Sequence, residues 1–188
     1  MSTNRFMRRH RAGISLALAM VFLGSESVPS RAEAYASAKV DDRGQLRIVT
    51  QSGRTIVPKK LADQVGFDAA QVSPDGRAVG WLAQFPNCCT SYPIPLKLVI
   101  RSNGKDRTFT GDDDLPVWRW HFTAGGKQVA FEQETVHGGM GIHYELHDIA
   151  TGKLIAAFDP APGYEPNSGV EADSVAVPEW VAGLDAQR

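Results

Sequence analysis

Apolar and polar residues alternate with a period of two along most of the chain beyond residue 45, and short turn sequences separate the alternating runs. Residues 46–50 read LRIVT, and residues 117–122 read VWRWHF. This period is typical of strands that bury one face, because successive side chains point to opposite sides of a sheet. Glycine-containing turns between such runs predict antiparallel hairpins. The pattern therefore predicts an all-β protein.

The expected strands alternate with Gly-, Pro-, Asn- or Asp-containing turns and loops, since these residues interrupt regular structure. The expected strands lie at 46–50, 55–57, 67–72, 78–85, 96–101, 107–110, 117–122, 128–134, 142–149 and 154–158. One helical turn is compatible with 59–67, where Gly66 would end it early, and a short helix with 179–186. We therefore expect four-stranded antiparallel sheets and very little helix.

Two segments that lie 50 residues apart repeat the same order of turn and strand. Residues 73–81 read SPDGRAVGW, and residues 123–131 read TAGGKQVAF. Each segment is followed by a loop, a strand, a Gly-containing turn and a last strand. Four-stranded units that recur about every 40 to 50 residues are typical of propeller blades.

The motif at 73–81 resembles the TolB-type and WD-like β-propeller repeats, whose blades open with a strand, a Ser-Pro-Asp-Gly-Lys/Arg turn and an apolar strand. The sequence DIATGK at 148–153 resembles the usual end of such a blade. The resemblance covers residues 67–158 and implies blade-like four-stranded sheets. Together with the hairpin at 46–57, it implies an incomplete, open propeller of about two and a half blades, because closed propellers have at least about four. An open monomeric stack is the preferred interpretation, and a compact stack of small sheets or one part of an oligomeric ring are the alternatives.

The first 34 residues have the pattern of a secretory signal peptide. A basic start at 1–11 precedes a 13-residue apolar run at 12–24, and the small residues Ala32 and Ala34 end a polar stretch. This order predicts cleavage after Ala34, with Ala32 and Ala38 as alternative sites. The apolar run is shorter than the roughly 20 residues that a membrane-spanning helix needs, so no stable membrane anchor is expected. We predict a periplasmic or secreted protein.

Three parts make up the expected domain organisation: the signal peptide at 1–34, the partial propeller domain at 35–159, and a Pro- and Gly-rich tail at 160–188 that holds the short helix. Removal of the first part leaves 154 residues with a net charge of −4, because it contains five of the 20 basic and two of the 21 acidic residues. A mildly acidic chain gives a nucleic-acid partner no electrostatic support.

Cys88 and Cys89 are adjacent and are the only cysteines of the chain. In an oxidising compartment neither has another intrachain partner, which predicts a disulfide between them, with two free thiols as the alternative. A catalytic cysteine would need a histidine beside it, and no histidine can be assigned to that role. A metal pair would need further ligands nearby.

The histidines and acidic residues give no metal-binding or catalytic pattern. On a strand, His143 and His147 are about 13 Å apart at about 3.3 Å per residue, too far to share one metal, so a polar outer face that also holds Glu145 is expected. The loop HGGMG at 137–141 is similar to esterase oxyanion loops, but the chain has no Gly-x-Ser-x-Gly elbow. The acidic run at 111–114 lacks the spacing of a calcium loop. We predict no catalytic residue, no metal site and no cofactor.

Aromatic residues alternate along the run at 117–122. Trp118, Trp120 and Phe122 are expected to share one face of a strand. Rings of this size pack between neighbouring sheets, so we expect them in the core, with a carbohydrate or peptide platform as the alternative.

Two loops exceed a tight hairpin turn, at 86–95 and 136–141, and occupy the same place in their repeats. Loops carry most binding groups of a rigid scaffold. The candidate binding residues in these loops are Asn87, Cys88, Cys89, Thr90, Ser91, Tyr92, His137, Gly138, Gly139 and Met140. We predict an exported binding protein without catalytic activity that contacts a protein partner, for example as an inhibitor or immunity protein for a secreted cell-wall hydrolase. The alternatives are an accessory subunit of an envelope assembly and a hydrolase.

Overall fold

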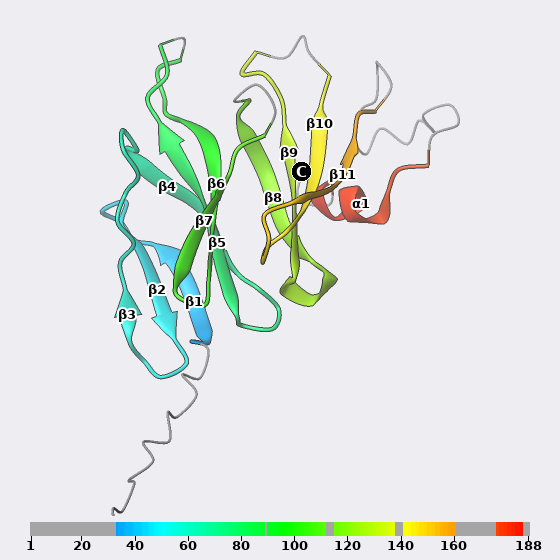
Figure 1. Cartoon of the computed structure of the whole chain (residues 1–188). Coiled ribbons are helices and arrows are strands. Elements are labelled where there is room, and N and C mark those ends of the chain that lie inside the picture. Colours follow the sequence, from blue (N-terminus) through cyan, green and yellow to red (C-terminus); the bar gives the residue numbers. More distant parts are fainter. Residues whose placement is uncertain (1–32, 89, 112–114, 138–140, 161–175, 186–188) are drawn as a thin grey trace, which may run out of the picture. The chain divides into compact units, whose positions relative to one another are not determined.

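A computed structural model of the chain describes residues 33–88, 90–111, 115–137, 141–160 and 176–185, which belong to one compact unit at 31–188. Strands dominate these ranges, and one α-helix follows them (Figure 1). The strands are β1 Tyr35–Val40, β2 Leu46–Thr50, β3 Thr55–Ile56, β4 Gly66–Val72, β5 Ala78–Phe85, β6 Ile94–Ser102, β7 Lys105–Phe109, β8 Val117–Thr123, β9 Gln128–Gln133, β10 His143–Asp148 and β11 Leu154–Phe158. The helix, α1, is Glu179–Asp185.

These strands form three antiparallel sheets, which confirms the predicted all-β class. The first sheet has the order β1-β2-β3, the second β4-β5-β6-β7 and the third β8-β9-β10-β11. Each strand of the two larger sheets pairs with its neighbours in sequence, as hairpin connections require. Strands β2, β5 and β11 have the predicted bounds, and the other expected strands differ from the prediction by at most two residues at either end.

The expected hairpin at 46–57 is confirmed, because β2 pairs with β3. A strand that was not expected, β1, extends it to three strands by pairing with β2 from Val40↔Leu46 to Tyr35↔Thr50. The helical turn expected at 59–67 does not form. The side chain of Gln64 instead accepts a hydrogen bond from the Leu61 amide and donates one to the Gly66 carbonyl, at 2.9 and 2.7 Å, which holds a non-helical turn.

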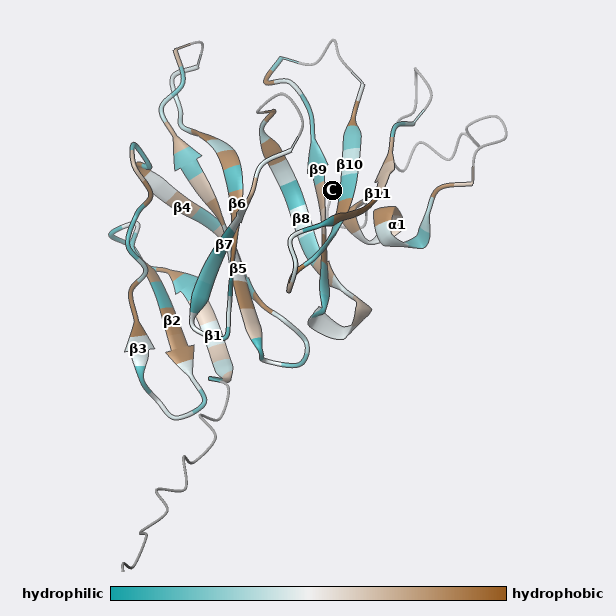
Figure 2. Ribbon diagram, in the orientation of Figure 1, coloured by the Kyte–Doolittle hydropathy of each residue, from teal (hydrophilic) through white to brown (hydrophobic). Residues whose placement is uncertain are grey.

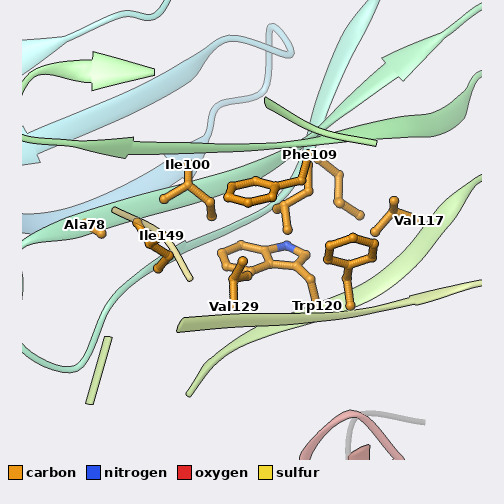
Figure 3. Packing of buried hydrophobic residues seen from close by; sticks show 10 residues of the cluster. Ala78, Ile100, Phe109, Val117, Trp120, Val129 and Ile149 are labelled. Carbon is orange, nitrogen blue, oxygen red and sulfur yellow. The ribbon is translucent and has the colours of Figure 1, made fainter. Parts of the chain in front are cut away.

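Alternate residues of β5 pack against different sheets, and this places the second sheet between the other two. Val79 and Trp81 belong to a buried cluster shared with the first sheet, whereas Ala78 and Leu82 belong to one shared with the third. The cluster between the second and third sheets is centred on Trp120 of β8 (Figure 3). A β-carbon at Gly80 would lie 2.5 Å from the Trp120 ring, so this glycine allows the close approach.

The other face of the third sheet is covered by α1, at the position where a short helix was expected. Val181 and Leu184 of the helix are fully buried against Tyr144 and Leu146 of β10. The imidazole Nε2 of His121 lies 2.9 Å from the Trp180 carbonyl oxygen, which adds a polar contact to the apolar packing. Burial of His121 lowers its pKa.

A bulge at the start of β8 changes the expected placement of the aromatic residues. The register with β9 shifts between Val117 and Arg119, so that Val117 and Trp120 both join the core while Trp118 does not. An extra residue in one strand shifts the alternation of side chains between the faces. The expectation that Trp118 shares a face with Trp120 is therefore wrong, whereas the core position of Trp120, fully buried, is confirmed.

Candidate functional site

The two longer loops leave the second and third sheets at the same end, which we call the loop end. One loop, at 86–93, joins β5 to β6, and the other, at 134–142, joins β9 to β10. Gly111, which follows β7, lies against the side-chain amide of Gln133, the last residue of β9, and this contact aligns the two sheets there. Both loops also appear on one side in Figure 1.

The loop at 86–93 is held by its own hydrogen bonds. Asn87 Nδ2 donates to Thr90 Oγ1 at 3.1 Å, and Thr90 Oγ1 donates to the Tyr92 carbonyl at 2.6 Å. The Tyr92 side chain remains 54% exposed, and Cys88 and Ser91 are exposed as well. Cys89 lies outside the described residues, so the predicted disulfide stays a prediction.

The loop at 134–142 begins at a fixed point. Trp118 Nε1 donates a hydrogen bond to the Glu134 carbonyl at 2.9 Å, so the bulged tryptophan of β8 anchors the start of the loop. His137 is exposed. The remaining candidate residues Gly138, Gly139 and Met140 lie outside the described part of the chain.

Beside this loop is a cavity of about 460 Å³, lined by Trp118, Arg119, Glu132, Glu134, Thr135 and Val136. A fully buried carboxylate, that of Glu132, forms its inner wall. Arg119 donates to both carboxylate oxygens, through Nε at 3.0 Å and through its terminal nitrogen. A bidentate pair of this kind fixes both side chains. Sequence reasoning missed the pair, because only the bulged register places Arg119 opposite Glu132.

A chain of polar side chains lies on the face of β10 that is turned toward the second sheet. The two oxygens of the buried Glu145 carboxylate lie 3.2 Å from His143 Nε2 and 2.6 Å from His147 Nε2. The second nitrogen of each imidazole lies near another oxygen. His143 Nδ1 is 2.6 Å from the Asp159 carboxylate, and His147 Nδ1 is 3.3 Å from the Gly152 carbonyl oxygen. The expectation of a polar outer face is therefore wrong.

Hydrogen bonding determines the direction of the pKa shifts of Glu145 and His143. Burial favours the neutral form of Glu145, but the bonds from His147 and His143 outweigh it and hold the pKa of the carboxyl below its ordinary value. Burial likewise disfavours a charged His143, yet its contacts with Asp159 and Glu145 raise the pKa of the imidazole. The arrangement is an internal ion cluster, in which the Glu145 carboxylate lies between the two imidazoles.

At the opposite end, which we call the turn end, four tight turns of the two larger sheets meet. They join β4 to β5, β6 to β7, β8 to β9 and β10 to β11. Gly126 lies against the Asp75 carboxylate, and Arg107 donates to the Ala150 carbonyl at 2.9 Å, so both contacts cross from one sheet to the other. A cavity of about 880 Å³ lies among these turns.

Neither end contains an arrangement of the described residues that would hold a metal ion: no three His, Cys, Asp or Glu side chains are grouped for it. Within the same residues, no helix has the length and apolar character needed to cross a bilayer. A scan against protein-family models finds no match to the chain, and a search among curated proteins finds none either.

Proposed function

We propose that the chain is an exported binding protein without catalytic activity, which contacts a protein partner through the two loops of the loop end. The observation that carries this proposal is that the two long connections between paired strands, at 86–93 and 134–142, leave the sheets on the same side. Binding groups concentrate on such loops, because the sheets beneath them tolerate little change. An inhibitor or immunity protein for a secreted cell-wall hydrolase is the specific form that we favour.

The internal bonds of the loop at 86–93 support a role in binding. A loop that is ordered before contact loses less conformational freedom when the partner arrives. Tyr92 offers a large, mostly exposed ring at its tip, and tyrosine is enriched in the central contacts of protein interfaces. His137 supplies an exposed polar group on the neighbouring loop.

We further propose that the three sheets are an incomplete, open β-propeller. The second and third sheets have the same strand order, and their second and third strands pair in equivalent register, with Val79↔Arg101 in one and Val129↔His147 in the other. Val79 and Val129 each pack toward the preceding sheet. Equivalent positions with equivalent packing are what tandem blades require.

Affinity capture from an envelope extract tests the proposed function. The protein as exported by its host is used as bait, beside the variants Tyr92→Ala and Val57→Ala. Val57 is a matched control, since it is 48% exposed and lies outside both loops. We expect one small secreted enzyme to be captured in stoichiometric amount, and the Tyr92 variant to lose most of it while the Val57 variant retains it.

Other outcomes would contradict this proposal. Capture of a multi-protein complex would indicate an accessory subunit, and equal loss in both variants would place the contact away from the loop end. Inhibition of the captured enzyme by the purified protein, with an equimolar end point, would establish the inhibitory form.

A further inference from the structure

We infer that the cavity at the turn end binds a small organic oxyanion, a molecule that carries a phosphate or carboxylate group on an apolar body. This inference concerns the end opposite to the two loops and does not depend on the function proposed for them. The cavity volume of about 880 Å³ falls within the range of about 300 to 1,000 Å³ that small-molecule sites occupy.

The floor of the cavity is apolar. Ala78, Ile100 and Ile149 line it, and all three belong to the buried cluster between the second and third sheets. Figure 3 shows the three side chains at one edge of that cluster. A ligand body that covers this floor gains from removal of apolar surface from water.

Cationic side chains form much of the rim. Arg77, Lys105, Arg107 and Lys127 line the cavity from both sheets. Two of them belong to β7, which is hydrophilic along most of its length (Figure 2) and has four of its five residues exposed. Arg107 is partly engaged by the Ala150 carbonyl. The side chains of the other three make no hydrogen bond or ion pair in the described part of the chain.

Three carboxylates also line the cavity, and each already accepts hydrogen bonds from the protein. Asp75 accepts from Ser73 Oγ at 2.7 Å and from the Arg77 amide at 3.0 Å. Asp148 accepts from the amide and hydroxyl of Thr151, both at 2.7 Å.

The third, Asp106, accepts two bonds from Arg101, at 2.6 and 2.7 Å, and Arg101 does not line the cavity. The acidic groups thus shape the turns or are paired, whereas the ammonium groups and the Arg77 guanidinium remain available to a ligand. Charge-assisted bonds to oxyanions are the strong interactions that such groups form.

The walls are set before any ligand arrives. The Gly126–Asp75 contact and the Arg107–Ala150 bond hold the two sheets together on either side of the cavity. Asn103 and Gly104 have left-handed backbone angles, with φ of 51° and 72°, which fix the β6–β7 turn that carries Lys105. A site that needs no rearrangement binds with a smaller entropic cost.

The test is a titration of the isotope-labelled protein with phenyl phosphate and, separately, with inorganic phosphate, followed by amide chemical shifts. We expect phenyl phosphate to shift the amides of 75–77, 102–108, 126–127 and 148–150 with a Kd of about 1 mM or tighter. Inorganic phosphate should bind the same amides several-fold more weakly, because it cannot cover the apolar floor.

Two double variants, each of which removes two positive charges, distinguish binding at this site from general electrostatic attraction of the anion to the protein. Lys105→Gln with Lys127→Gln should raise the Kd for phenyl phosphate about tenfold, which corresponds to about 1.4 kcal/mol shared between two cations. Lys39→Gln with Lys59→Gln, at exposed lysines that do not line the cavity, should leave it unchanged. The inference is overturned by shifts elsewhere or none at all, by equal weakening in both variants, or by equal affinity for the two phosphates.

Discussion

The imidazole of His147 stacks on the ring of Phe131, with ring centroids 5.3 Å apart and planes inclined by 14°. The same imidazole also contacts the ring of Phe109 of the second sheet in a T-shaped arrangement, with centroids 5.3 Å apart and planes inclined by 70°. The histidine therefore joins the apolar contact between two sheets to the ion cluster of Glu145 and His143. Protonation within that cluster is coupled to the packing of the sheets.

This coupling predicts a pH dependence of stability. The lowered pKa of Glu145 stabilises the fold at pH values above the pKa of about 4.3 that a glutamate has in the unfolded chain. This contribution is lost as the pH falls through the pKa of Glu145 in the folded protein. The raised pKa of His143 stabilises the fold below the unfolded value of about 6.5, and this contribution is lost as the pH rises through the folded value. The cluster therefore contributes most between about pH 4.3 and pH 6.5.

Calorimetric melting of the protein and of the His143→Gln variant across this range measures that contribution. We expect the difference in Tm between them to be largest in the mildly acidic window and to shrink toward about pH 8, above the ordinary histidine pKa. The His121→Gln variant is the control: its difference in Tm from the parent protein should change with pH in the opposite direction, since burial lowers the pKa of His121. A difference for His143 that does not vary with pH would show that the imidazole does not titrate with the fold.

Substitution of Gly80 tests the packing between the second and third sheets. A β-carbon there would lie 2.5 Å from both Ile100 Cδ1 and the Trp120 ring, so Gly80→Ala should lower the free energy of unfolding by about 1 to 3 kcal/mol. Denaturant unfolding measures the change. Gly141→Ala is the control, because a β-carbon at Gly141 meets nothing within 4 Å. Equal stability of the two variants would mean that Trp120 does not pack on β5 as described.

Truncation of Leu184 tests the docking of α1. The side chain is fully buried against the third sheet, so Leu184→Ala should cost about 2 to 5 kcal/mol of unfolding free energy. The partly exposed Val177, 36% accessible just before the helix, serves as the control and should change stability by no more than about 0.5 kcal/mol on truncation. If both variants unfold like the parent protein, the helix is not bound to the sheet in solution.

The position of β1 favours some of the expected signal-peptide cleavage sites over others. Cleavage after Ala34 keeps all of β1, whereas cleavage after Ala38 would remove Tyr35, which is 1% exposed and whose amide donates to the Gly76 carbonyl at 2.7 Å. Mass spectrometry of the exported protein should therefore find an N-terminus at Tyr35 or Glu33. A chain that starts at Lys39, or one that keeps Met1 in a membrane fraction, would contradict this prediction.

Much of the fold could be predicted from the sequence because local signals and final pairing agree. The turn residues Ser73 to Gly76 sit between two alternating runs, and the structure places strands on both sides of them. The run Tyr35–Val40 was missed since its small residues at 36–38 give little apolar alternation, and it pairs through contacts with β2 that only the folded chain provides.

Side-chain placement was harder to predict than strand position. The alternation rule assigns faces correctly only while the register is regular, and the bulge at Val117/Arg119 moved Trp118 off the core face. The rule also cannot say which face is covered, so it places His143 and His147 outside, although the His147 ring packs against Phe109 of the second sheet. The turn-end cavity is formed by four turns from distant parts of the chain, so no local sequence pattern predicts it.

Helix α1 has a consequence for self-association. It occupies the face of the third sheet on which the next sheet of a ring would have to pack. A second copy could reach that face only after the helix had left it, with Val181 and Leu184 returned to water. Addition of a further copy at that face would therefore begin with an unfavourable undocking step, and the helix would raise the concentration that the protein needs to extend the stack of sheets.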